Sequence, residues 1–287
     1  MKRLLVVADD LGLTLGVNRG IATAFREGIL TSASLLTNTP HFDATLALAR
    51  DLPGLKVGIH LTLVGGVPVL APESVPSLAP REGRFRSSWR LFLPAWLAGR
   101  IRKEDVRTEW RAQVWRAVER GLRPSHLDSH QHLHLLPGLW RIARNLCREF
   151  GIPRLRITRA VGRSAPEVPA FRRLVRVALS RLSPRPGATD GPPRSCDHFL
   201  GAAEAGRLNL PLLLSALRRV PDGWTELVTH PGIQDPELIR DYPWGYAWEA
   251  ELAALCSGEA RFEMARLGIA LDRDHPLTQE VATSHDR

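Results

Sequence analysis

The sequence predicts one α/β domain in which parallel strands and helices alternate in a barrel-like arrangement, similar to an irregular TIM barrel, with two insertions. Short apolar runs alternate with segments whose apolar residues recur at helical spacing. The 287 residues suit a single barrel-sized domain. Polar side chains also follow several of the apolar runs, as expected where a site lies at the carboxyl ends of parallel strands.

The first third of the chain contains three strand predictions. Leu4 to Val7 is a continuous apolar run, which is typical of a strand buried on both faces. Further strands are expected at 31–36 and 56–59, the latter ending at His60. Helical spacing over 18–27 and 42–50 places a helix after each of the first two strands.

The rest of the chain continues this alternation around two segments rich in Pro and Arg. These segments, 64–103 and 159–200, are predicted to be insertions, the first with a short helix and the second with an amphipathic part at 172–182. The domain is expected to span 1–275, with a polar tail at 276–287. Helices are expected at 105–120, 137–150, 208–220, 247–255 and 260–266, and strands at 124–129, 154–157, 225–228 and 268–271.

Composition restricts the possible partners. The net charge of +9 comes mostly from arginines that are scattered among acidic residues, so we expect no nucleic-acid partner. No apolar run is long enough for a membrane span. The N-terminus superficially resembles a signal peptide, but its apolar run has only five residues and leads directly into Asp9 and Asp10, so a cytoplasmic protein is expected. The insertions offer a surface for a homo-oligomer, which the sequence leaves open.

Acidic and imidazole side chains follow four of the predicted strands. Asp9 and Asp10 are adjacent carboxylates at a buried strand end, an arrangement that a cation would stabilise. One of them could instead cap the turn that follows. His60 and His230 each end a strand, and histidine is the side chain most often used as a general acid or base.

A histidine tract lies between residues 126 and 134. In an extended chain its alternate residues would share one face, yet only one or two of its imidazoles could reach a single ion. The spacing does not decide which of them bind metal and which hold other roles, and a surface tract that binds metal adventitiously is the simpler alternative. The tract contains His126, His130, His132 and His134.

Together these segments resemble the YdjC/ChbG family of carbohydrate deacetylases, from Leu4 to about Leu271. The family usually has Phe where this chain has Leu11, an apolar exchange that concerns packing more than chemistry. The motifs that carry the resemblance are Ala8-Asp9-Asp10-Leu11-Gly12, Gly58-Ile59-His60-Leu61-Thr62-Leu63, the tract His126 to His134, and Thr229-His230-Pro231.

The resemblance implies a metal-dependent hydrolase that removes N-acetyl groups from an amino sugar or an N-acetylated oligosaccharide. It implies that Asp10, His60 and His130 bind one divalent metal ion, magnesium or zinc, and that Asp9 is the general base and His230 the general acid. Two imidazoles and one carboxylate favour zinc by ligand softness.

The roles of neighbouring residues are open. Asp128 and Arg156 are candidates to orient a ligand histidine or Asp9, or to bind substrate, and His126 and His132 are candidates for similar roles. An amidohydrolase-type enzyme would use a His-x-His pair on its first strand, whereas here the first strand ends in aspartates. A protein that only stores metal or binds an anionic polymer is the non-enzymatic alternative.

Overall fold

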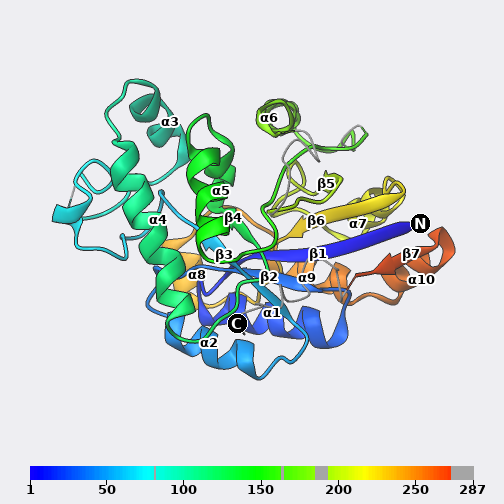
Figure 1. The fold of residues 1–287 in the computed structure, drawn as a ribbon. Helices are drawn as coiled ribbons and strands as arrows, with labels where there is room; N and C mark the ends of the chain where they lie inside the picture. Colours follow the sequence, from blue (N-terminus) through cyan, green and yellow to red (C-terminus); the bar gives the residue numbers. More distant parts are fainter. Residues whose placement is uncertain (81, 163–164, 185–192, 273–287) are drawn as a thin grey trace, which may run out of the picture.

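The strands run parallel in a single curled sheet with helices around it (Figure 1). The computed structural model describes residues 1–80, 82–162, 165–184 and 193–272. The strand order is β4-β3-β2-β1-β6-β5, and β7 pairs with the start of β1. The strands are β1 (Lys2–Leu11), β2 (Ser32–Leu35), β3 (Lys56–Leu61), β4 (Leu127–Ser129), β5 (His198–Leu200), β6 (Gly223–Thr229) and β7 (Ile269–Leu271).

Single bridges join the segment 154–160 to each of the two edge strands of this sheet. Leu155 pairs with Leu127 of β4, and Ala160 pairs with Phe199 of β5. The segment 154–160 therefore lies between the edges, which confirms the predicted parallel, barrel-like α/β fold. Two details of the prediction were wrong: 154–157 forms isolated bridges instead of a regular strand, and β5 lies in a segment predicted to be an insertion.

The helices follow the predicted order and connect successive strands. Thr14 caps α1 by accepting a hydrogen bond from the Val17 amide, and Gly268 ends α10 in the left-handed conformation that glycine adopts without strain. Sequence spacing did not predict the short helix α8. The α-helices are α1 (Leu15–Glu27), α2 (Phe42–Arg50), α3 (Trp89–Leu97), α4 (Lys103–Val118), α5 (Leu139–Glu149), α6 (Ala170–Leu182), α7 (Leu210–Leu217), α8 (Pro236–Asp241), α9 (Trp248–Cys256) and α10 (Gly258–Leu267).

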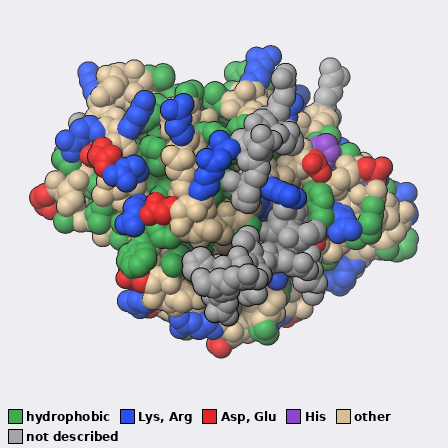
Figure 2. Space-filling model, in the orientation of Figure 1, with side chains coloured by type: hydrophobic (Ala, Val, Ile, Leu, Met, Phe, Trp, Pro, Cys, Tyr) green, Lys and Arg blue, Asp and Glu red, His purple; other side chains and the backbone are tan. Residues whose placement is uncertain are grey.

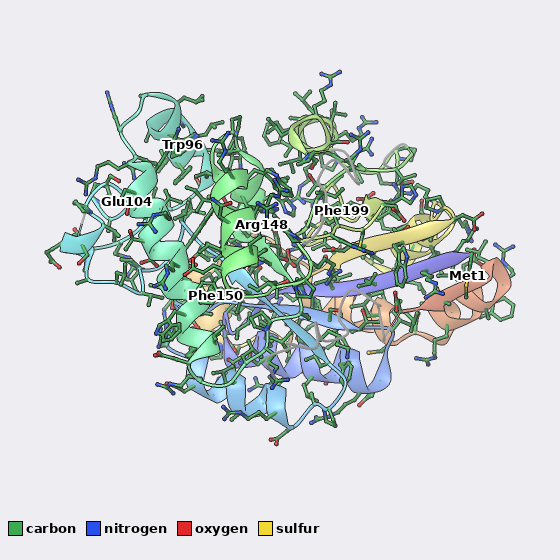
Figure 3. The ribbon with its side chains drawn as sticks, viewed as in Figure 1. Met1, Trp96, Glu104, Arg148, Phe150 and Phe199 are labelled. Atoms are coloured by element: carbon green, nitrogen blue, oxygen red, sulfur yellow. The ribbon has the colours of Figure 1, made fainter. Side chains whose placement is uncertain are left out.

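Aromatic and aliphatic contacts join the helices to the sheet and to one another. The middle of β1 is fully buried, as the apolar run predicts. Phe150, just after α5, lies against α4, where its ring is 6.5 Å from the ring of Trp115 (Figure 3). Trp110 of α4 is completely buried in the main core.

The first predicted insertion holds the 3-10 helix η1 (Pro72–Ser74) and α3, and it is tied to α4. The buried Glu109 carboxylate accepts hydrogen bonds from the amides of Val69 and Leu70, and Asp105 accepts from Ser77. The second predicted insertion holds α6 and β5. The extent of the domain stays a prediction, and the predicted tail at 276–287 lies outside the described residues.

The molecular surface is rich in basic side chains. Lys and Arg are spread over much of the face in Figure 2, with Asp and Glu side chains among them. Within the part of the chain that the structure describes, no helix has the length and apolar character needed to cross a membrane.

Candidate active site

The predicted site residues converge on one cavity at the carboxyl ends of the strands. Asp9 lies near the end of β1, His60 near the end of β3, and His130 and His230 directly after β4 and β6. All four line a cavity of about 640 Å³. Parallel strands bring these positions together because their carboxyl ends meet at the same edge.

Asp10 interrupts the regular geometry of β1. Successive strand residues normally point to opposite faces of the sheet. Asp10 has a φ of 64°, and the pairing of β1 with β2 shifts register between Ala8 and Leu11. Asp tolerates this left-handed conformation better than most residues. As a result, carboxylate oxygens of both Asp9 and Asp10 lie within 4.0 Å of His60 Nε2.

Asp10, His60 and His130 bring three potential ligand atoms together. Asp10 Oδ1 is 3.0 Å from His130 Nδ1 and 3.5 Å from His60 Nε2. This oxygen is buried and no described group forms a hydrogen bond of good geometry with it. Burial alone would raise the pKa of Asp10, but the neighbouring His130 and His60 hold it well below its usual range. Two imidazole nitrogens and an otherwise unbonded carboxylate oxygen fit a divalent transition metal ion.

Asp128 fixes the orientation of His60. Its Oδ1 is 2.7 Å from His60 Nδ1, which leaves Nε2 directed at Asp10. Burial opposes a charge on His60, but Asp128 and Asp9 outweigh it and raise the pKa of His60 to about 9. A carboxylate behind a histidine in this way is the usual support of a metal-binding imidazole.

Arg156 is the buried cation at the centre of the acidic cluster. It donates to both oxygens of Asp9 at 2.8 and 2.7 Å and to Glu226 at 2.5 Å, and it lies 2.7 Å from Asp128. Burial lowers the pKa of Arg156, but Asp128 and Asp9 hold it well above its usual range. Together with Asp10, these acidic residues provide four buried carboxylates.

The cluster as a whole carries an excess of negative charge. Those four buried carboxylates face two buried guanidinium groups, Arg156 and Arg154, the latter 3.3 Å from Glu226. Uncompensated charge is costly in a buried site. A protonated His60 offsets part of this charge, and a divalent cation bound to Asp10 and to neutral His60 would balance it.

The rest of the histidine tract does not join this cluster. Beyond Ser129 the chain enters the 3-10 helix η2 (His130–Leu135), where Gln131 and His132 have φ values of 53° and 54°. The assumption of an extended chain with alternating faces was therefore wrong from residue 130 onward. Of the tract, His130 is the residue that the structure brings to Asp10 and His60.

The other three histidines of the tract have separate surroundings. His126 Nε2 is 3.0 Å from Ser34 Oγ, and Gly58 lies so close to its ring that a side chain there would collide with it. His134 is hydrogen-bonded to Ser129 and to the carbonyl of Arg156. His132 lines the cavity, its ring 5.8 Å from the ring of Phe199 (labelled in Figure 3), but its Nδ1 has no hydrogen-bond partner among the described residues.

His230 lines the cavity among aromatic side chains. Its backbone amide donates to Glu251 at 2.6 Å, and its ring is 5.2 Å from that of Tyr246. Trp244 stands beside His130 at 5.4 Å. The His230 Nδ1 atom has no hydrogen-bond partner among the described residues.

Sequence reasoning missed several residues of this site. Glu226 is a single acidic residue within an otherwise apolar part of β6, and that exception was the available signal. Glu251 and Tyr246 gave no comparable signal, because an acidic residue in a helix and an aromatic residue in a loop are ordinary.

The chain is similar to several known proteins. The family model described as YdjC-like protein matches residues 3–266. A carbohydrate deacetylase from Brevibacillus brevis is 42% identical over 53% of this chain, but the match spans only 58% of that relative. A carbohydrate deacetylase from Geobacillus stearothermophilus is 31% identical over 93% of this chain and 94% of its own.

A solved structure is similar over most of its length. It is the crystal structure of a proposed cellobiose-phosphate cleavage protein from Enterococcus faecalis, which is 28% identical. The match covers 94% of this chain and 97% of that one, with a TM-score of 0.75. The similarity therefore includes the strand ends that form the cavity.

Proposed function

The chain belongs to the YdjC-like protein family, and on that premise we propose that it is a metal-dependent carbohydrate deacetylase. The reaction is hydrolysis of the N-acetyl group of an amino sugar or an N-acetylated oligosaccharide. The observation that carries the proposal is the cluster of Asp10, His60 and His130 in a cavity that Asp9 and His230 also line.

The proposed ion-binding residues are Asp10, His60 and His130. When bound, a divalent ion would polarise the acyl carbonyl and make a water molecule more acidic. The donor set favours zinc over magnesium, because imidazole is a softer ligand than oxygen. Asp128 holds His60 by its Nδ1 and so keeps Nε2 free to bind.

Asp9 is proposed to be the general base. It lines the cavity, and Arg156 donates one hydrogen bond to each of its oxygens. Each carboxylate oxygen can accept a further hydrogen bond, so Asp9 can take a proton from the attacking water. Arg156 keeps the carboxylate in place while this happens.

His230 is proposed to be the general acid. The amine that leaves in amide hydrolysis is a poor leaving group unless it is protonated. The ring of His230 lies in the wall of the cavity, and the hydrogen bond from its backbone amide to Glu251 fixes the turn that carries it. His230 would protonate the amine nitrogen as the C–N bond breaks.

The amidohydrolase alternative needs His130 and His132 at the same ion. In the described part of the chain, the groups able to hold an ion include His130 and not His132. The geometry therefore favours the deacetylase assignment.

The test is release of acetate by chelator-stripped protein from a panel of N-acetylated mono- and oligosaccharides, with zinc, magnesium or cobalt added separately. We expect metal-dependent acetate release that is lost in His130→Ala. No release from any sugar, in protein that binds metal, would contradict the proposed substrate class.

A further inference from the structure

The helix α6 turns its apolar side to the cavity. Five of its apolar residues line the cavity, and their spacing puts them on one helical face. No residue of α6 is buried, and Phe171 and Leu182 are 51% and 41% exposed. In Figure 1, α6 stands apart from the other helices, above β5. The five residues are Phe171, Val175, Ala178, Leu179 and Leu182.

Apolar side chains also form the opposing wall of this part of the cavity. They are Leu133 of η2, Leu136 just after it, and Leu93 of α3. The Arg90 guanidinium lies 5.3 Å from the Phe171 ring and 5.8 Å from the Trp89 ring, so it links the starts of α3 and α6. The cavity is thus polar at the strand ends and mainly apolar toward α6. The lining there also includes Arg172, whose guanidinium donates to the carbonyl of Ala205, and Ser88, Arg90 and Gln131 line the side formed by α3 and η2.

This division of the cavity is informative about its ligand. An amphipathic helix normally buries its apolar face against a core. The apolar face of α6 borders a cavity instead, so an apolar ligand group there would remove its side chains from water. From Val175 to Leu182 the α6 side chains that line the cavity are all aliphatic, so the hydroxyl groups of a second sugar would find no hydrogen-bond partners along this part of the helix.

We propose that the substrate is an amphiphile in which the N-acetylated amino sugar carries a hydrocarbon aglycone that lies along α6. The inference rests on the proposed deacetylase function. It places the sugar next to His130, His230 and Trp244 and the hydrocarbon between α6 and η2. The polar and aliphatic parts belong to one continuous cavity, so one molecule can occupy both.

The test uses alkyl glycosides of N-acetylglucosamine, from methyl to octyl, together with N-acetylated disaccharide, all below their critical micelle concentrations. Acetate release by the metal-loaded protein is measured as kcat/KM. We expect about a threefold to fourfold rise for each methylene group that the cavity covers. Binding of the same glycosides is measured in parallel by quenching of tryptophan fluorescence, which does not require turnover.

Two variants place a polar group in the aliphatic wall, and one serves as a matched control. Leu179→Gln and Leu182→Gln should each lower the ratio of octyl to methyl glycoside activity by about tenfold. Glutamine is a good helix former, so α6 should persist. Arg181→Gln, on the exposed side of the same helix, should keep the ratio of the unaltered protein.

The outcomes separate this inference from the proposed function. Acetate release that is independent of alkyl length, or that is fastest with the disaccharide, overturns the inference and leaves the deacetylase function standing. Tighter binding of longer glycosides without any acetate release supports the apolar subsite and contradicts the proposed function. If Leu179→Gln only splits a dimer in sedimentation, α6 covers a second copy of the chain and the inference is wrong.

Discussion

Two parts of the cavity are built in opposite ways: the polar end at the strand ends, here called the floor, and the apolar side formed by α6, here called the wall. At the floor, His60, Asp128 and Arg156 are each no more than 1% exposed, and each has a charged partner at hydrogen-bonding distance. Along α6 the side chains facing the cavity are apolar apart from Arg172, and none of them is buried. The floor comes from strand ends, whereas the wall comes from a segment between strands. The sheet therefore fixes the positions of the reactive groups. The fit of a substrate depends on separate segments, which can differ without displacing those groups.

The largest expected effect is on turnover. Asp9→Asn should lower kcat by about a hundredfold to ten-thousandfold, because the amide cannot accept the proton from water. Metal content should stay unchanged: Asp9 also belongs to a second group that could hold an ion, with His60 and Asp128, but both of its oxygens accept hydrogen bonds from Arg156. Measured acetate release near the normal rate would refute the assignment of Asp9 as the base.

Removal of the Arg156 guanidinium should strongly destabilise the floor. Arg156→Met leaves Asp9, Asp128 and Glu226 buried without their common partner, and the free energy of unfolding should fall by about 3–5 kcal/mol. Leu174→Gln, on the exposed part of α6, should change it by less than about 0.5 kcal/mol. Urea unfolding of the two variants tests this contrast. Equal losses would contradict the assignment of Arg156 as the cation that stabilises the floor.

A smaller effect, on zinc affinity, is expected when Asp128, which supports His60, is changed. Asp128→Asn weakens the contact that orients His60, so zinc affinity should fall by about tenfold to a hundredfold. Competition with a chromogenic chelator measures this change. Unaltered affinity would show that His60 is held in place without Asp128.

The buried neutral histidines of the tract predict a pH dependence of stability. Burial lowers the pKa of His134 to about 4, and burial lowers the pKa values of His126 and His132 well below their usual range. The unfolded chain binds more protons than the folded one below a pH of about 6.5, so stability should fall from there toward about 4. The slope should approach ~1.4 kcal/mol per pH unit for each such group. Urea midpoints that stay constant over this range would contradict it.

The sequence predicted the fold well where local pattern and tertiary structure agree. The apolar run of β1 and the helical spacing of α2 were both recognisable, because burial acts on these segments directly. β5 has only three residues and lies next to segments rich in Pro and Arg, so its strand character depends on pairing with β6. Such pairing is not encoded locally.

The site was predictable to a similar degree. Asp9, His60 and His230 were identified as candidates because each follows a predicted strand in the sequence. Spacing alone did not single out His130 within its tract, because left-handed residues at Gln131 and His132 break the spacing rule for extended chains; the family resemblance implied this histidine. The partners Glu226 and Glu251 act from other elements of the fold, and sequence spacing carries no information about such distant contacts.

Measurement of bound metal tests the central claim most directly, that Asp10, His60 and His130 hold one divalent ion at the floor. Chelator-stripped protein should bind one zinc ion per chain after equilibrium dialysis. His130→Ala should lose this ion, and His132→Ala, altered two residues away in the same tract, should keep it. Equal binding by the two variants would contradict the claim and indicate adventitious binding by the histidine tract.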